Sequence, residues 1–219
     1  MTAPRRPDRF VAVLALLLLG VAVWSVVRPY ELGTWVAETF PAWIGAALLA
    51  ATYRRFPFTP VTYLLVAIFA AVLLVGGHYT YARVPLGNWV RDLAGLERNH
   101  FDRMGHFLQG VVPALLAREL LLRKTPLRPG GWLFTLVGSV ALAVSACYEI
   151  FEWWFAVAFG GAQAVDFLGA QGDVWDAQWD MFLALSGAVL AQLLLARLQD
   201  RQLVRMGEFQ AAPSQPADA

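Results

Sequence analysis

The chain reads Tyr148-Glu149-Ile150-Phe151-Glu152-Trp153-Trp154 inside a segment that is otherwise apolar enough to span a bilayer. Its two carboxylates are three residues apart, so they share one face of a helix. A charged side chain near the centre of a membrane helix costs about 2.5–3.5 kcal/mol on insertion scales and usually faces a protein interior or a water-filled pocket. We therefore expect Glu149 and Glu152 to meet polar side chains from other helices.

The composition indicates an integral membrane protein. Of the 219 residues, 58% are hydrophobic and only 15% are charged, which is too apolar for a soluble domain of this size. The single cysteine, Cys147, excludes an intrachain disulfide and a cysteine-based zinc site, and we expect it to be a small buried apolar side chain. A net charge of +1 gives no support for nucleic-acid binding.

Six apolar segments predict an all-α transmembrane bundle. The first follows Arg5, Arg6 and Arg9 and is longer than the apolar core of a signal peptide, without a clear cleavage site, so we predict an uncleaved span. A polar loop from Tyr81 to Asn99 separates the third and fourth spans. The predicted spans are residues 10–27, 35–52, 61–78, 101–122, 132–159 and 174–198. We expect one domain over residues 1–205 and a disordered cytoplasmic tail over residues 206–219.

The positions of Lys and Arg predict the orientation of the bundle. Basic residues in short loops lie on the cytoplasmic side of a membrane. Twelve of the 17 basic residues lie at the N-terminus, after the second and fourth spans, or near the C-terminal end, and five lie on the other side. Both termini are therefore expected to be cytoplasmic.

This topology brings polar residues from several spans to the outer face. Counted at about 1.5 Å per residue, polar side chains of the fourth to sixth spans all fall within the outer leaflet and agree in depth to about one or two turns. We expect a polar site that opens outward, where Gly105, Gly110 and Gly187 let the helices approach closely. Its members are His78, His100, Asp102, Arg103, His106, Gln109, Glu149, Glu152, Asp173, Asp176 and Asp180.

Simpler roles stay open for many of these residues. A histidine near a span end, such as His78, is expected to form an ordinary interfacial hydrogen bond. Asp102, Asp173 and Asp176 could cap helix N-termini and complement the helix dipole. A purely structural network is a further alternative, in which Arg103 or His106 neutralises Glu149 or Glu152 and ties three spans together.

The first functional hypothesis is a metal-assisted enzyme that acts on a lipid-linked or envelope substrate at the outer leaflet. Imidazole and carboxylate groups suit Zn²⁺, Mn²⁺ or Mg²⁺, and a bound cation activates water. In this interpretation His106, Glu149 and Asp180 are the metal ligands, and Glu152 or Asp176 is the general base. The spacing matches no named metal motif.

The second hypothesis is a proton- or cation-coupled carrier, in which Glu149, Glu152 and His106 titrate together. The inner halves of the spans are mostly Leu, Val and Ala, so the sequence indicates no polar path to the cytoplasmic side, and we find no internal repeat. The third hypothesis is a non-catalytic binding or assembly protein that uses the cluster as a structural clasp. The only partners indicated directly are membrane lipids, and no oligomeric state can be inferred.

The order of the polar residues also resembles a known pattern. Asp102-Arg103-x-x-His106-Phe107, Glu149-x-x-Glu152 and Asp176-x-x-x-Asp180 resemble VanZ-like membrane proteins, which have Gln and Asn where this chain has Glu152 and Asp180. The chain is more similar still to the YjdF-type bacterial inner-membrane proteins, a family of unknown function. The resemblance covers about residues 76–195 and implies a multi-pass protein of the bacterial inner (plasma) membrane and the cell envelope.

Overall fold

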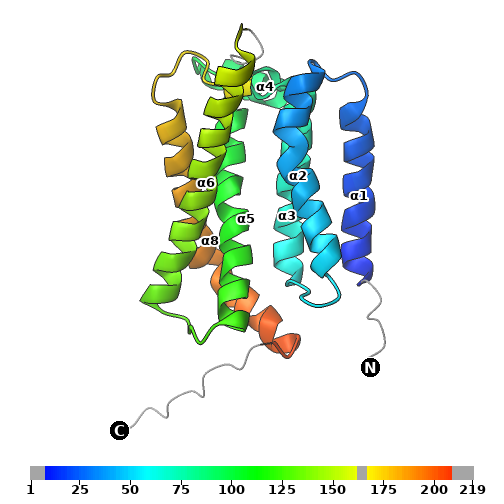
Figure 1. The fold of residues 1–219 in the computed structure, drawn as a ribbon, viewed down its shortest axis with the longest axis vertical. Coiled ribbons are helices and arrows are strands. Elements are labelled where there is room, and N and C mark those ends of the chain that lie inside the picture. Colours follow the sequence, from blue (N-terminus) through cyan, green and yellow to red (C-terminus); the bar gives the residue numbers. More distant parts are fainter. Residues whose placement is uncertain (1–7, 162–166, 209–219) are drawn as a thin grey trace.

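The computed structural model describes residues 8–161 and 167–208, and every regular element in these ranges is helical (Figure 1). The elements are α1 (Arg9–Val26), α2 (Leu32–Thr52), α3 (Pro60–Tyr79), the 3₁₀ helix η1 (Tyr81–Arg83), α4 (Pro85–Ala94), α5 (Phe101–Lys124), α6 (Gly131–Phe159) and α8 (Asp176–Arg205). The predicted all-α class is therefore confirmed. Arg5, Arg6 and the expected tail beyond residue 208 lie outside the described residues.

The helix boundaries differ from the predicted spans at three places. Helix α2 begins three residues earlier than expected, because the Glu31 side chain accepts hydrogen bonds from the backbone N–H groups of Gly33 and Thr34. Helix α8 begins at Asp176 rather than residue 174 and continues to Arg205, one to two turns beyond residue 198. The segment expected to be a polar loop contains η1 and α4.

Helix α4 has the usual signals of a short surface helix. Pro85 occupies its first turn, where no backbone N–H is needed, and Gly95 ends it in the left-handed conformation. The helix has 10 residues, too few for a membrane span. It lies across one end of the bundle, and the start of α1 and the end of α8 lie toward the other (Figure 1). We call these the α4 end and the terminus end.

Within the described residues, four helices are long and apolar enough to cross a membrane: α1, α3, α6 and α8. Helices α2 and α5 have 21 and 24 residues, which is sufficient length, but their composition is less apolar. Helix α5 carries Asp102, Arg103, Arg118 and Glu119 along its length.

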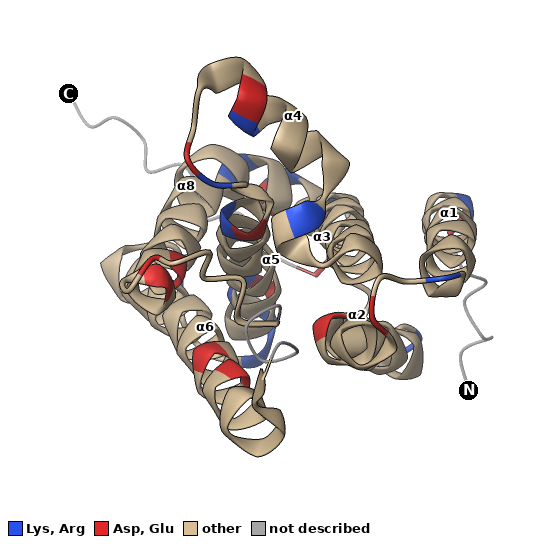
Figure 2. Cartoon of the chain, turned by 90° about the horizontal axis from the view of Figure 1, so that it is seen from above, with Lys and Arg blue, Asp and Glu red and all other residues tan. Residues whose placement is uncertain are grey.

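Helix α5 occupies the middle of the bundle. It packs against α3, α6 and α8, while α1 and α2 pack on α3 (Figure 2). Its contacts with α6 and α8 form a core that includes Leu115, Val137, Ala141 and Ala188, all fully or almost fully buried. Because other helices cover it on several sides, α5 can carry polar side chains without exposing them to lipid.

Two glycines bring α5 and α8 into backbone contact, as the sequence predicted. Gly110 faces the backbone of Ala184, and Gly187 faces the carbonyl oxygen of Phe107. A Cβ atom at either glycine would overlap these backbone atoms. The third expected glycine, Gly105, packs instead beneath the ring of Tyr81, which a Cβ would approach to 3.3 Å.

The terminus end contains a buried polar cluster that the sequence analysis did not identify. The Glu119 side chain is 0% exposed and accepts hydrogen bonds from both the backbone N–H and the hydroxyl of Thr59. Thr62 and Gln199 also donate to it. This carboxylate ties the start of α3 to α5 and α8.

Replacing Gly110 by Ala should destabilise the protein, because the new methyl group meets backbone that cannot rotate away. Overpacking of this kind costs about 1–3 kcal/mol. We expect a lower melting temperature in detergent, measured by loss of the native fluorescence signal. The matched control is Gly20→Ala in α1, where a Cβ meets nothing within 4 Å. Equal melting temperatures for the two variants would contradict the close crossing.

Candidate functional site

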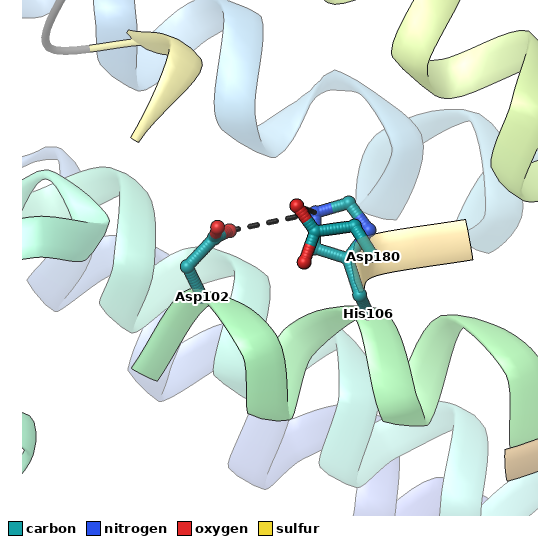
Figure 3. Close-up of side chains that lie close together, drawn as sticks. All are labelled: Asp102, His106 and Asp180. Atoms are coloured by element: carbon teal, nitrogen blue, oxygen red, sulfur yellow. Dashed lines mark ion pairs between the residues drawn. The ribbon is translucent and has the colours of Figure 1, made fainter. Parts of the chain in front are cut away.

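Asp102 and His106 lie four residues apart on α5 and point toward Asp180 of α8 (Figure 3). The Nε2 atom of His106 is 3.5 Å from Oδ1 of Asp102 and 3.9 Å from Oδ2 of Asp180. All three side chains are buried. We refer to them as the Asp–His–Asp cluster.

Asn99 explains why Asp102 can belong to this cluster. The Asn99 side chain accepts a hydrogen bond from the backbone N–H of Phe101 and donates to the carbonyl oxygens of Ala82 and Val84. It therefore supplies a hydrogen-bond acceptor to the first backbone N–H of α5 and ties this helix to η1. Asp102 is not the residue that caps α5, and its carboxylate is left to face His106.

Glu149 lies on the other side of the imidazole ring. Its Oε1 atom is 3.5 Å from Nδ1 of His106, so carboxylates face both ring nitrogens. In the described structure Nδ1 of His106, Oε1 of Glu149 and Oδ1 of Asp180 are buried without a hydrogen-bond partner. Buried polar atoms in proteins are rarely left unpaired, so these atoms indicate a place for a ligand, a water or a proton.

Asp102, His106 and Asp180 each offer a ligand atom, and these atoms lie within 4.8 Å of one another. One imidazole and two carboxylates suit Zn²⁺, Mn²⁺ or Mg²⁺. Two of the expected ligands, His106 and Asp180, belong to this set. The third member is Asp102, which the sequence placed in the wider polar site, and not Glu149, which the sequence suggested as a ligand.

Glu152 faces a different space from Glu149. It is buried on α6 and lines a cavity of about 410 Å³ together with Asp102, His106 and Gln109. The Oε1 atom of Gln109 is buried and has no partner in the described structure. Glu152, one of the two residues predicted as general base, thus lies beside the Asp–His–Asp cluster, one turn of α6 away from Glu149.

Sequence reasoning missed Glu38. This residue of α2 is 2% exposed and lines the same cavity as Glu152. Within residues 8–161 and 167–208, neither the Glu38 nor the Glu152 carboxyl group forms a hydrogen bond or an ion pair. An acidic residue inside the apolar segment 35–52 is the same signal that selected Glu149, and it could have identified Glu38.

Two arginines form ion pairs with Asp173 and Asp176, the remaining aspartates of the expected polar site. Arg98 forms an ion pair with Asp176 at 2.6 Å and also binds the carbonyl oxygens of Gly169 and Ala170. Arg103 pairs with Asp173 rather than with Glu149 or Glu152, so that part of the expected structural network is wrong. The Asp173 carboxylate also accepts a hydrogen bond from the Trp175 N–H just before α8 begins.

Both of the other histidines lie away from the cluster. The Nδ1 atom of His78 is 3.0 Å from the carbonyl oxygen of Ser25, and its ring packs 4.3 Å from that of Trp24. His78 thus joins α3 to α1, in agreement with the simpler role left open for it. His100 immediately precedes α5, and burial together with Arg103 and Arg98 lowers its pKa.

A family model described as "Predicted membrane protein (DUF2238)" matches residues 10–201 of the chain. The chain belongs to the DUF2238 family. It is 49% identical over 193 residues to the inner membrane protein YjdF of Escherichia coli (strain K12), a match that covers 88% of this chain and 92% of the relative. No solved structure matches the chain.

These matches confirm the resemblance to YjdF-type proteins and extend it over the first three helices, α1 to α3. This DUF2238 protein is an integral membrane protein of the bacterial inner membrane. The resemblance to VanZ-like proteins stays a prediction, as do the roles of the individual site residues.

The Asp173 contacts predict how the stability of this DUF2238 protein depends on pH. The Trp175 N–H, and then Arg103 and Arg98, hold the pKa of Asp173 below 3.8 against partial desolvation. The carboxylate therefore stabilises the fold fully above 3.8, and this contribution is lost as the pH falls through the lowered pKa.

Asp173→Asn should accordingly lower the melting temperature at neutral pH, and the difference from the wild type should shrink as the pH falls below 3.8. Melting curves of both proteins across this range check the expectation. Asp92→Asn is the control, because Asp92 is exposed on α4 and, among the residues that the structure describes, pairs with its neighbour Arg91 alone. A difference that persists unchanged at low pH would mean that the Asp173 charge is not the cause.

Proposed function

We propose that the protein crosses the inner membrane six times, with both termini in the cytoplasm and the α4 end at the outer face. Helices α2 and α5 supply the two spans that composition alone does not identify. The position of α5 among α3, α6 and α8 supports this assignment, since its polar residues face other helices. The basic residues Arg123, Lys124 and Arg205 at the terminus ends of α5 and α8 agree with a cytoplasmic location.

Reporter fusions test this topology. A green fluorescent protein fused to either terminus should fluoresce, because it folds in the cytoplasm, and alkaline phosphatase at either terminus should be inactive. Alkaline phosphatase inserted after Gly95, at the end of α4, should be active. Activity at only one terminus would require an odd number of spans.

The Asp–His–Asp cluster is proposed to bind one divalent cation. The observation that carries this proposal is the convergence of three ligand atoms from the buried residues Asp102, His106 and Asp180, where Oδ1 of Asp180 has no hydrogen-bond partner in the described structure. Two carboxylates and an imidazole buried together are costly to leave uncompensated, and a cation offsets their charge. A cation held by Asp102, His106 and Asp180 would polarise a substrate oxygen or activate a water molecule.

The reaction proposed for the site is metal-assisted hydrolysis or transfer on a lipid-linked or envelope substrate at the outer leaflet. Glu152 is the better candidate for the general base, because it is unpaired in the described structure and lines the cavity. Asp176 is held by the Arg98 guanidinium and is therefore less free to accept a proton. Glu149 would orient His106 through its second ring nitrogen.

A proton- or cation-coupled carrier is the second candidate. The Glu119 cluster at the terminus end supports it, because polar groups are then present at both ends of α5. Between the two clusters, however, α5 is packed by apolar residues such as Val111, Ala114 and Leu115. A transport path would have to open this core, whereas a reaction at the outer leaflet would not.

Elemental analysis of the untagged protein, purified in detergent and supplied with Zn²⁺, Mn²⁺ or Mg²⁺, tests the cation site. We expect one ion per chain in the wild type. Asp180→Asn and Asp102→Asn should weaken binding by at least about 10–100-fold, the effect typical of disturbing a metal site. Asp92→Asn should retain the ion. Absence of any ion after repletion would favour the carrier or a purely structural network.

A further inference from the structure

The cavity beside the Asp–His–Asp cluster has a polar end and an apolar end. Its volume of about 410 Å³ lies within the range of small-molecule sites, about 300–1,000 Å³. Residues of α2, α3, α5 and α6 line it. Glu38, Asp102 and Glu152 lie toward the α4 end, and Leu48 and Pro113 lie further along α2 and α5. A ligand that fits it has a polar group at one end and a long apolar part.

The cavity opens sideways, at the depth of the bilayer. Ile44, Leu48 and Val144 line it and are nevertheless 53%, 60% and 40% exposed. They belong to α2 and α6, which both lie below the pair α3 and α5 in Figure 2. A surface of this kind on membrane helices faces lipid chains, so the cavity can be reached from the membrane.

Aromatic rings beside the carboxyl groups join α2 to α6. The Phe40 ring of α2 lies 4.7 Å from that of Phe151 on α6 and stacks with Tyr148 at 6.5 Å. Phe167, 2% exposed, packs edge-on against Phe151 at 5.9 Å. Phe40 follows Glu38 on α2 and Phe151 precedes Glu152 on α6, so these rings lie at about the depth of the carboxyl groups. The exposed lining residues Ile44, Leu48 and Val144 lie further toward the terminus end.

The length of the cavity matches one lipid leaflet. From Glu38 to Leu48, α2 rises by ten residues, or about 15 Å at 1.5 Å per residue. The hydrocarbon core of a bilayer is about 30 Å thick, so this is about half of it. With the carboxyl groups nearer the α4 end, a lipid of the outer leaflet would enter in its normal orientation.

The charge of the polar end selects among lipids. Glu38 and Glu152 have no partner in the described residues, and Asp102 is close by in the same cavity. Carboxylates that lack a partner attract a positive group that donates hydrogen bonds and repel an anionic one. An ammonium group carries one positive charge and three donors.

We propose that this cavity binds one acyl chain of a membrane lipid, admitted between α2 and α6, with an ammonium headgroup paired with Glu38 and with Glu152 left free to act as the base. The inference deepens the proposed function by naming the substrate class, an amine-bearing phospholipid. Only the reaction of this lipid depends on the proposed function. The lipid site itself depends only on the cavity, its lateral opening and its unpaired carboxyl groups.

Photocrosslinking tests the proposal on the full-length protein reconstituted in phosphatidylcholine vesicles. The probes are phosphatidylethanolamine and phosphatidylglycerol, each with a diazirine in one acyl chain. We expect phosphatidylethanolamine to label peptides of α2 and α6 in preference to phosphatidylglycerol. Glu38→Gln combined with Glu152→Gln should abolish this preference, because the carboxylates supply it.

A cavity-filling variant provides the matched comparison. A Cβ at Gly45, which lines the cavity, meets nothing within 4 Å, so Gly45→Leu can extend a side chain without a backbone clash. Labelling should fall at least about tenfold, the change expected when a few methylene groups lose their site. Gly20→Leu in α1, where a Cβ also meets nothing within 4 Å, should label like the wild type. Val144→Trp replaces Gly45→Leu if the latter fails to fold.

The two proposals fail separately. Asp180 does not line the cavity, so Asp180→Asn should lose the metal ion and keep lipid labelling. Gly45→Leu should keep the metal ion and lose lipid labelling. Labelling that is unchanged by the cavity-filling variants, or equal for the two wild-type probes, overturns the lipid site. Competition by a polyprenyl phosphate but not by phosphatidylethanolamine also overturns it and assigns the cavity to another lipid.

Discussion

Burial of charge along one helix constrains the whole structure. Helix α5 carries Asp102 and His106 near one end and Arg118 and Glu119 near the other, and all four side chains are buried. None of them is tolerated against lipid without a partner. Helices α3, α6 and α8 surround α5 and supply apolar contacts, while α8 contributes the polar side chains of Asp180 and Gln199.

The two polar clusters of α5 differ in how well they are satisfied. At the terminus end, the Glu119 carboxylate accepts several hydrogen bonds, and Arg118 binds Gln199 and Asp200. Such a fully paired network fixes the helices relative to one another. At the α4 end, His106 and Glu149 retain unpartnered atoms. Stability and ligand binding are thus assigned to opposite ends of the same helix.

Much of the fold could be predicted because hydropathy and helix-breaking residues are local signals. The apolar runs identified all six long helices, and the spacing of Asp102 and His106 placed them on one face. The pairing of individual charged residues was harder to predict from the sequence. Arg103 binds Asp173 and not Glu149, and this depends on how the chain before α8 returns across the bundle. Periodicity carries no information on such a loop.

Two buried carboxylates escaped prediction for different reasons. Glu38 gave the same signal as Glu149, but no second charged residue lies three or four positions from it on its helix. Glu119 lies next to Arg118 near the end of an apolar segment, where the sequence resembles an ordinary charged helix end. Its hydrogen-bond partner Thr59 is 60 residues away, and only the packing of α3 on α5 brings the two together.

The exposed lining of the cavity at Ile44, Leu48 and Val144 has a consequence for the rates of any process in the cavity. A molecule that arrives through the lateral opening first dissolves in the bilayer, where it diffuses in two dimensions. Occupancy then follows the mole fraction of that molecule in the outer leaflet, and its concentration in the surrounding water matters only through partitioning. The composition of the membrane would therefore act as the substrate concentration of this protein.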